Sequence, residues 1–122
     1  MDVDGVRDRA RGCLLGQFIG GSLGSLVGLR SQASIAAGYP DGVRELADGG
    51  TWDLIAGQPT DDSQMAMMLI RSLDELGVFD ADDVLRRYVH WYSTGPFDIG
   101  GTCAVALSGG PLNEDSQANG AL

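Results

Sequence analysis

The chain has 122 residues, of which 43% are hydrophobic, so it can form one packed domain, and wholesale disorder is excluded. Its 8 basic residues, all arginine, face 17 aspartates and glutamates, which gives a net charge of −9. Because this charge repels phosphate backbones, nucleic-acid binding is not expected, whereas cation binding is.

Cysteine and histidine are scarce. Cys13 and Cys103 are too few for a disulfide scaffold and form no C-x-x-C pair. Reduced thiols and a cytoplasmic location are therefore expected. His90 is the one histidine, so a metal site built on clustered imidazole and thiolate ligands is excluded. Any metal site in this chain would use oxygen ligands.

Residues 7–29 are predicted to form a helix with a stripe of glycines at every fourth position. Each glycine weakens a helix by about 0.8–1 kcal/mol relative to alanine, so close approach of another backbone is expected to compensate. The stripe consists of Gly12, Gly16, Gly20, Gly24 and Gly28.

Residues 12–29 contain no charged side chain, and three interpretations follow. A buried core helix in a larger helical domain is favoured, because Gln17, Ser22 and Ser25 are polar. A membrane helix packed through its glycine stripe is the second. A signal peptide cleaved near Ala36 is the third, although the mixed charges of residues 1–11 argue against it.

Glycine and proline punctuate residues 30–59, which are predicted to be a loop. The 3–4 spacing of the following residues predicts a helix over Asp61–Leu76 that ends at Gly77. Its expected buried face is Met65, Met68, Leu69, Ser72, Leu73 and Leu76.

Asp80 is predicted to cap a further helix with Arg86 and Arg87 on the solvent side. Its apolar side is Val84, Leu85, Tyr88, Val89 and Tyr92. A turn is expected over residues 93–101, then a helical or buried segment over Thr102–Leu107 and a polar tail. These elements predict an all-α protein whose apolar faces are only partly covered.

The adjacent carboxylates Asp61 and Asp62 allow two interpretations. Acidic residues at a helix N-terminus stabilise it by about 0.3–1 kcal/mol, and Asp61 with Gln64 resembles a capping box. Alternatively, the Thr60 hydroxyl and both carboxylates converge on a hard cation such as Mg²⁺, Mn²⁺ or Ca²⁺, with further ligands from elsewhere.

Other candidate groups favour structural roles. The acidic cluster at residues 79–83 is no calcium loop, because the sixth position counted from Asp80 is Leu85, where glycine is required. Its aspartates are interpreted as cap and first-turn charges, and His90 as a helix-surface or core residue. Ser63 and Ser93 lack the surroundings of a nucleophile.

Four segments, taken together and in order, resemble the ADP-ribosylglycohydrolase family. They are "RARGCLLGQFIGGSLGSLVG", "GQPTDDSQMAM", "WYSTGPFDIGGTCAVAL" and "SQANGAL", and they span residues 9–122. The resemblance implies the N-terminal part of a compact all-α domain, with residues 1–122 as a partial domain. It also implies hydrolysis of the glycosidic bond between ADP-ribose and a protein or small acceptor.

The resemblance further implies a site with two Mg²⁺ or Mn²⁺ ions. Thr60, Asp61 and Asp62 would be metal ligands. The loop containing Asp98, Gly100, Gly101 and Thr102 would lie along the ribose and diphosphate of an ADP-ribosyl ligand. The family's second acidic motif is not within these 122 residues. Two explanations follow for a fragment: a complementary C-terminal chain as partner, or a truncation.

The chain departs from the family pattern at positions that matter for catalysis. Gly21 and Gly28 stand where the family has an aspartate and a glutamate, and Gly101 replaces an asparagine. Gly21 and Gly28 are expected to lie two turns apart on the same side of one helix. The chain is therefore expected to be inactive alone or degenerate. The alternatives are a non-catalytic module that binds ADP-ribose or a protein, and a small membrane-associated helical protein.

Overall fold

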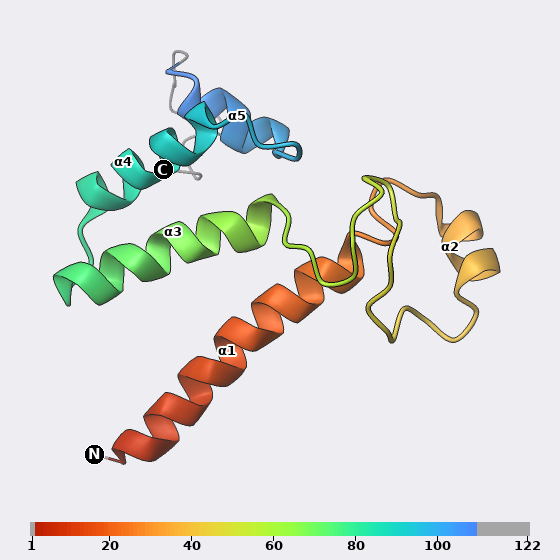
Figure 1. Cartoon of the computed structure of the whole chain (residues 1–122), viewed down its shortest axis with the longest axis horizontal. Helices are drawn as coiled ribbons and strands as arrows, with labels where there is room; N and C mark the ends of the chain where they lie inside the picture. The colour runs from red at the N-terminus through yellow and green to blue at the C-terminus, as the bar shows by residue number, and fades with distance from the viewer. Residues whose placement is uncertain (1, 110–122) are drawn as a thin grey trace. The chain divides into compact units, whose positions relative to one another are not determined.

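The structure, a computed structural model, describes residues 2–109. This part of the chain contains five α-helices, and its only extended pairing is an isolated bridge between Gly49 and Leu54 (Figure 1). The all-α prediction is therefore confirmed. The chain divides into two units, residues 1–63 and residues 64–122, and each is described by itself.

The first unit begins with α1 (Val3–Gly24). The Asp2 side chain caps it by accepting a hydrogen bond from the Gly5 amide at 3.0 Å. After Gly24 the bonding tightens to i→i+3, from the Val27 amide to the Gly24 carbonyl, and the chain turns at Leu29 with φ 63°. Gly28 consequently lies beyond the helix, so the prediction that Gly21 and Gly28 share one helix is wrong.

Within the described residues α1 is largely exposed, with Ser22 as its single buried residue, so its burial in a larger helical domain stays a prediction. Leu15 and Ile19 are 60% and 48% exposed. Among the described residues the glycine stripe meets no other backbone: a Cβ atom at Gly12, Gly16, Gly20 or Gly24 would have none of their atoms within 4 Å, its own helix backbone aside. Within residues 2–109, no helix has the length and apolar character that crossing a membrane requires.

The region predicted to be a loop contains a short helix, α2 (Gln32–Gly38). Ser31 caps it by accepting a hydrogen bond from the Ser34 amide at 3.2 Å. The prediction missed α2 because a seven-residue segment shows too little periodicity to compete with the glycine and proline residues that follow it.

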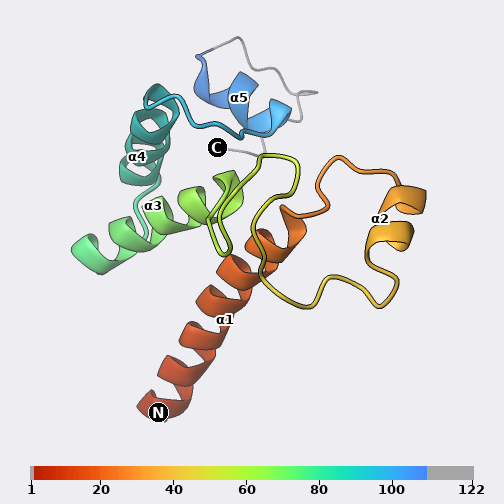
Figure 2. The same cartoon turned by 45° about the vertical axis from the view of Figure 1, so that its right-hand side comes forward.

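The loop after α2 returns to the C-terminal end of α1 (Figures 1 and 2). There the Thr51 hydroxyl donates to the carbonyl of Gly28. Gly50 has φ +79°, and a Cβ atom at this position would lie 2.6 Å from the Ser25 carbonyl oxygen. Only glycine fits such an approach without displacing the backbone. The close backbone contact of this unit is therefore made by Gly50 and not by the glycine stripe.

The helix α3 (Asp61–Leu76) has the predicted bounds. Gly77 ends it with φ +69°, and its amide bonds the Leu73 carbonyl at 2.9 Å. The predicted inner face is only partly covered, since Ser72 is fully buried while Leu73 and Leu76 are 40% and 46% exposed.

The second unit continues with α4 (Ala81–Ser93) and α5 (Gly101–Leu107), which pack against each other. Asp80 caps α4 as predicted, accepting from the Asp83 amide at 2.9 Å. The buried apolar residues of this unit are Val84, Trp91, Ala106 and Leu107. Trp91, which the predicted apolar side omitted, donates from Nε1 to Oε1 of Gln64 at 2.7 Å.

Four polar residues tie α3 to α4, and we name them the α3–α4 clasp: Ser72, Glu75, Asp83 and Arg87. Asp83 is 6% exposed and accepts from Ser72 Oγ at 2.7 Å and from Arg87 Nε at 2.6 Å. Arg87 also donates to both carboxylate oxygens of Glu75, at 3.3 and 2.6 Å. The assignment of Arg87 to the solvent side is therefore wrong, because its side chain is only 22% exposed.

The clasp sets the charge state of its members. The Ser72 hydroxyl and the Arg87 guanidinium both hydrogen-bond the Asp83 carboxylate and lower its pKa. Hydrogen bonding and charge attraction from Arg87 likewise lower the pKa of Glu75. Both carboxylates are thus held ionised next to a permanent cation.

Candidate functional site

The expected metal ligands lie together at the start of α3. Thr60 precedes the helix and is 6% exposed, Asp61 is half-buried in the first turn, and Asp62 is exposed. A helix N-terminus attracts negative charge, so the two carboxylates stabilise α3 whether or not an ion is bound. Both interpretations of the sequence remain compatible with this geometry.

The ligand set at this helix end is incomplete for a metal ion. Within residues 2–109, no three side chains from histidine, cysteine, aspartate and glutamate lie close enough together to hold one. Thr60, Asp61 and Asp62 offer hydroxyl and carboxylate oxygens, which suit Mg²⁺ or Mn²⁺ in type. Octahedral coordination of such an ion would need further ligands from outside the described residues or from water.

The residue after this segment, Ser63, is an unexpected feature of the site. Its side chain is 0% exposed, and its Oγ atom has no hydrogen-bond partner in the described structure. Such an atom points to an absent partner, because a buried hydroxyl without a hydrogen bond costs about 1–3 kcal/mol. Thr60 and Ser63 are both buried and lie three residues apart. Residues at this spacing share one side of a helix, and this is the signal in the sequence that could have identified Ser63.

The Ser63 hydroxyl faces Gly21 of α1. A Cβ atom at position 21 would lie 3.1 Å from Ser63 Oγ, so it would fit after a shift of a few tenths of an ångström. An aspartate at this position would bring a carboxylate within hydrogen-bonding reach of the hydroxyl. With Gly21 present, the Ser63 hydroxyl faces a position that carries no side chain.

Gly28 has a different setting. A Cβ atom there would meet only backbone of its own turn, the carbonyl oxygens of Gly24 at 3.7 Å and Ser25 at 4.0 Å. These are ordinary van der Waals distances, so a Cβ atom fits at this position. Gly21 and Gly28 thus belong to different backbone elements, one to a helix and one to the turn that follows it.

The expected substrate loop lies in the second unit, at the start of α5. Asp98 is half-buried, Gly100 is the N-cap of α5, and Gly101 and Thr102 are exposed in its first turn. Within residues 2–109, no neighbouring atom would lie within 4 Å of a Cβ atom at Gly100 or Gly101. The motif "SQANGAL" lies outside the described residues.

Comparison with known proteins supports the family resemblance. The ADP-ribosylglycohydrolase family model matches residues 2–122. The chain is 34% identical to the ADP-ribosyl-[dinitrogen reductase] glycohydrolase of Rhodospirillum rubrum, over 95% of this chain and 42% of that protein. It is 32% identical to the ADP-ribosylarginine hydrolase Tri1 of Pseudomonas putida, over 79% of this chain and 24% of that protein.

The chain thus spans less than half the length of these relatives. The match nevertheless covers nearly all of the 122 residues, including α1, the start of α3 and the loop before α5. The chain belongs to the ADP-ribosylglycohydrolase family.

Proposed function

We propose that this chain supplies the first metal-binding segment of a site that hydrolyses the glycosidic bond between ADP-ribose and a modified protein or small acceptor. Family membership and the names of the relatives, which act on ADP-ribosylated dinitrogen reductase and ADP-ribosylarginine, support this reaction class. The observation that carries the proposal is that Thr60, Asp61 and Asp62 lie together at the N-terminus of a 16-residue helix.

In this proposal Thr60, Asp61 and Asp62 hold Mg²⁺ or Mn²⁺ through their side-chain oxygens. The bound ions, two in the full family site, would lower the pKa of a water molecule and orient the ribose hydroxyls. The loop of Asp98, Gly100, Gly101 and Thr102 binds the ribose and diphosphate. Residues 1–122 act as a partial domain, and a complementary C-terminal segment supplies the remaining ligands.

A second candidate function is binding of ADP-ribose without hydrolysis. Gly21 and Gly28 favour it, because both stand where the family resemblance implies carboxylates that would serve acid–base chemistry. The unpartnered Ser63 hydroxyl beside Gly21 also favours it, since the group that would face this hydroxyl is absent.

Manganese binding tests the metal proposal directly. The electron paramagnetic resonance signal of free Mn²⁺ is measured while the wild-type chain, Asp62→Asn or Asp82→Asn is added. Asp82 is the matched control, because it is also an exposed acid in the first turn of a helix, α4. We expect weak binding by the wild-type chain, binding at least about tenfold weaker in Asp62→Asn, and no change in Asp82→Asn.

Equal losses of Mn²⁺ affinity in the two variants would show that the effect comes from the net charge of the chain. That result would contradict the metal assignment. A titration with ADP-ribose and an assay of ADP-ribosylated-protein hydrolysis together separate the two functions. Hydrolysis of an ADP-ribosylated protein supports the enzyme, whereas saturable ADP-ribose binding with no turnover supports the binding module.

A further inference from the structure

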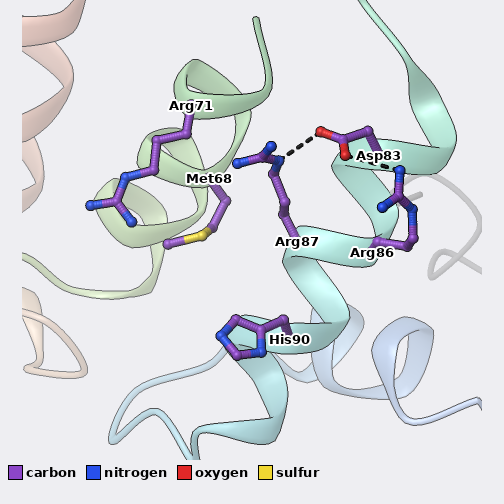
Figure 3. A pocket seen from close by; sticks show the side chains of 6 residues that line it. All are labelled: Met68, Arg71, Asp83, Arg86, Arg87 and His90. Atoms are coloured by element: carbon purple, nitrogen blue, oxygen red, sulfur yellow. Dashed lines mark hydrogen bonds and ion pairs between the residues drawn. The ribbon is translucent and has the colours of Figure 1, made fainter. Parts of the chain in front are cut away.

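A hollow of about 310 Å³ lies between α3 and α4 in the second unit (Figure 3). None of its lining residues belongs to the segments expected to bind metal or ribose. The lining residues are Met68, Arg71, Asp83, Arg86, Arg87 and His90. The chain carries a net charge of −9, yet three of its 8 arginines and its one histidine line this single hollow. The local charge is therefore opposite in sign to that of the whole chain.

Arg87 is held in a fixed orientation within this hollow. Its guanidinium donates to Asp83 and to both oxygens of Glu75, at distances between 2.6 and 3.3 Å. A guanidinium has five N–H groups, so three are used and two remain. The α3–α4 clasp thus orients a permanent cation whose remaining donors are available to a ligand.

Arg71 and Arg86 add charge that the protein leaves mostly unpaired. The Arg86 side chain is 74% exposed and makes one ion pair, to Asp83 at 3.0 Å. Arg71 is exposed on α3 and makes no hydrogen bond or ion pair within residues 2–109. Even with Glu75 counted beside Asp83, three positive charges meet two negative ones.

Both helices contribute side chains to the lining of the hollow. Arg71 and Met68 come from α3, and Arg86, Arg87 and His90 come from α4 (Figure 3). On α4, Arg86 lies four residues before His90 and Arg87 lies three residues before it, so both neighbour His90 along the helix surface. Met68 supplies an apolar wall beside the cationic groups.

We propose that this hollow binds the phosphate group of a small ligand. Guanidinium forks match the tetrahedral oxygens of phosphate and form two parallel hydrogen bonds with them. A volume of about 310 Å³ is at the lower end of the range for small-molecule sites, so it suits one phosphate with a small attached group. Two sources share this chemistry, inorganic phosphate and a nucleoside monophosphate.

The test is calorimetric titration of the wild-type chain with inorganic phosphate, AMP and acetate, at constant ionic strength. Arg71→Gln and Arg30→Gln are compared. Arg30 is an exposed arginine outside the hollow, so its substitution makes the same change in net charge. We expect Arg71→Gln to weaken phosphate binding about tenfold or more, which is the effect of losing one hydrogen bond to a charged group. Arg30→Gln is expected to leave it unchanged.

The choice of ligands identifies the source of the phosphate. Tighter binding of AMP than of phosphate, reduced by Met68→Ser, assigns the hollow to a nucleotide, and equal binding assigns it to inorganic phosphate. Acetate binding as tight as phosphate binding would overturn the proposal, as would equal losses in the two arginine variants. Amide resonances of Arg71 and His90 are expected to shift on binding. Shifts confined to Asp98–Thr102 would place the phosphate in the proposed substrate loop and also contradict the inference.

Discussion

Two serines on α3 allow a matched test of the packing, because the same substitution is expected to have opposite effects. Ser63 and Ser72 are both 0% exposed. The Ser72 hydroxyl donates to Asp83 at 2.7 Å, whereas the Ser63 hydroxyl has no partner in the described structure. Replacing either residue with alanine removes one oxygen atom and changes helix propensity by a similar amount. The difference between the variants therefore isolates the hydrogen bond.

The magnitudes follow from the state of each hydroxyl. Removing the bonded hydroxyl of Ser72 leaves its partner under-satisfied and lowers the free energy of unfolding by about 1–3 kcal/mol. Removing the unbonded hydroxyl of Ser63 relieves a desolvation cost of about 1–3 kcal/mol. A small void at position 63 offsets part of this gain. We expect Ser63→Ala to be more stable than Ser72→Ala by at least about 2 kcal/mol, which is roughly a thirtyfold difference in the unfolding equilibrium.

Urea denaturation followed by circular dichroism at 222 nm measures both free energies. Ser34→Ala is the baseline, because Ser34 is exposed on α2. The slopes of the unfolding free energy against urea must agree among the variants for the comparison to hold. If Ser63→Ala lost as much stability as Ser72→Ala, the Ser63 hydroxyl would have a partner in solution, and the argument from an absent carboxylate at position 21 would fail.

Two further predictions concern the clasp and the loop that meets α1. The pKa values of Asp83 and Glu75 are lowered in the folded state from ordinary values of 3.8 and 4.5, so the folded chain binds fewer protons than the unfolded one. Their stabilisation is therefore complete only above about pH 5.5 and is lost as the pH falls through the lowered values. Arg87→Met is expected to flatten this acid dependence of the thermal midpoint between pH 2 and pH 6, and an unchanged pH profile would contradict the role given to the clasp. Gly50→Ala is expected to destabilise the first unit by more than about 2 kcal/mol, because both the φ of +79° and the Ser25 carbonyl oppose a Cβ atom. Gly42 has a φ of +81° but open space around it among the described residues, so Gly42→Ala is expected to cost about 1–2 kcal/mol. Equal urea midpoints for these two variants would refute the close approach of Gly50 to α1.

The helices α3 and α4 could be predicted because their signals are local. Gly77 adopts φ +69° at the end of α3, and Asp80 caps α4, as expected from residue type alone. The role of Arg87 could not be predicted in this way. Helical periodicity places it beside Arg86 on the solvent side, and only the pairing of α4 with α3 brings Glu75 within reach. Long-range polar contacts of this kind leave no periodic signal.

In the candidate site, too, the features with a local sequence signal could be predicted, and those that depend on the rest of the fold could not. The position of Thr60, Asp61 and Asp62 at a helix start followed from their sequence, because acidic residues favour that position. The end of α1 could not be predicted in this way. Small and apolar residues continue past Gly24, and no proline or charged residue lies between Gly24 and the turn at Leu29. The burial of Ser63 depends on its surroundings in the fold, so residue type alone did not predict it.

We propose that the Thr60–Asp62 segment serves a metal-dependent glycohydrolase site and that Gly21 and Gly28 weaken this site. The most direct test of this proposal is release of ADP-ribose from an ADP-ribosylated protein, with Mg²⁺ or Mn²⁺ present. The chain is combined with the C-terminal portion of the Rhodospirillum rubrum relative and compared with Gly21→Asp, Gly28→Glu and Asp61→Asn/Asp62→Asn variants.

We predict slow release by the combined protein, an increase of about 10²-fold or more when the carboxylates are restored, and loss of release in Asp61→Asn/Asp62→Asn. Release as fast as that of the intact relative, unchanged by Gly21→Asp and Gly28→Glu, would contradict the claim that the site is weakened. Release that survives Asp61→Asn/Asp62→Asn would contradict the metal role of this segment.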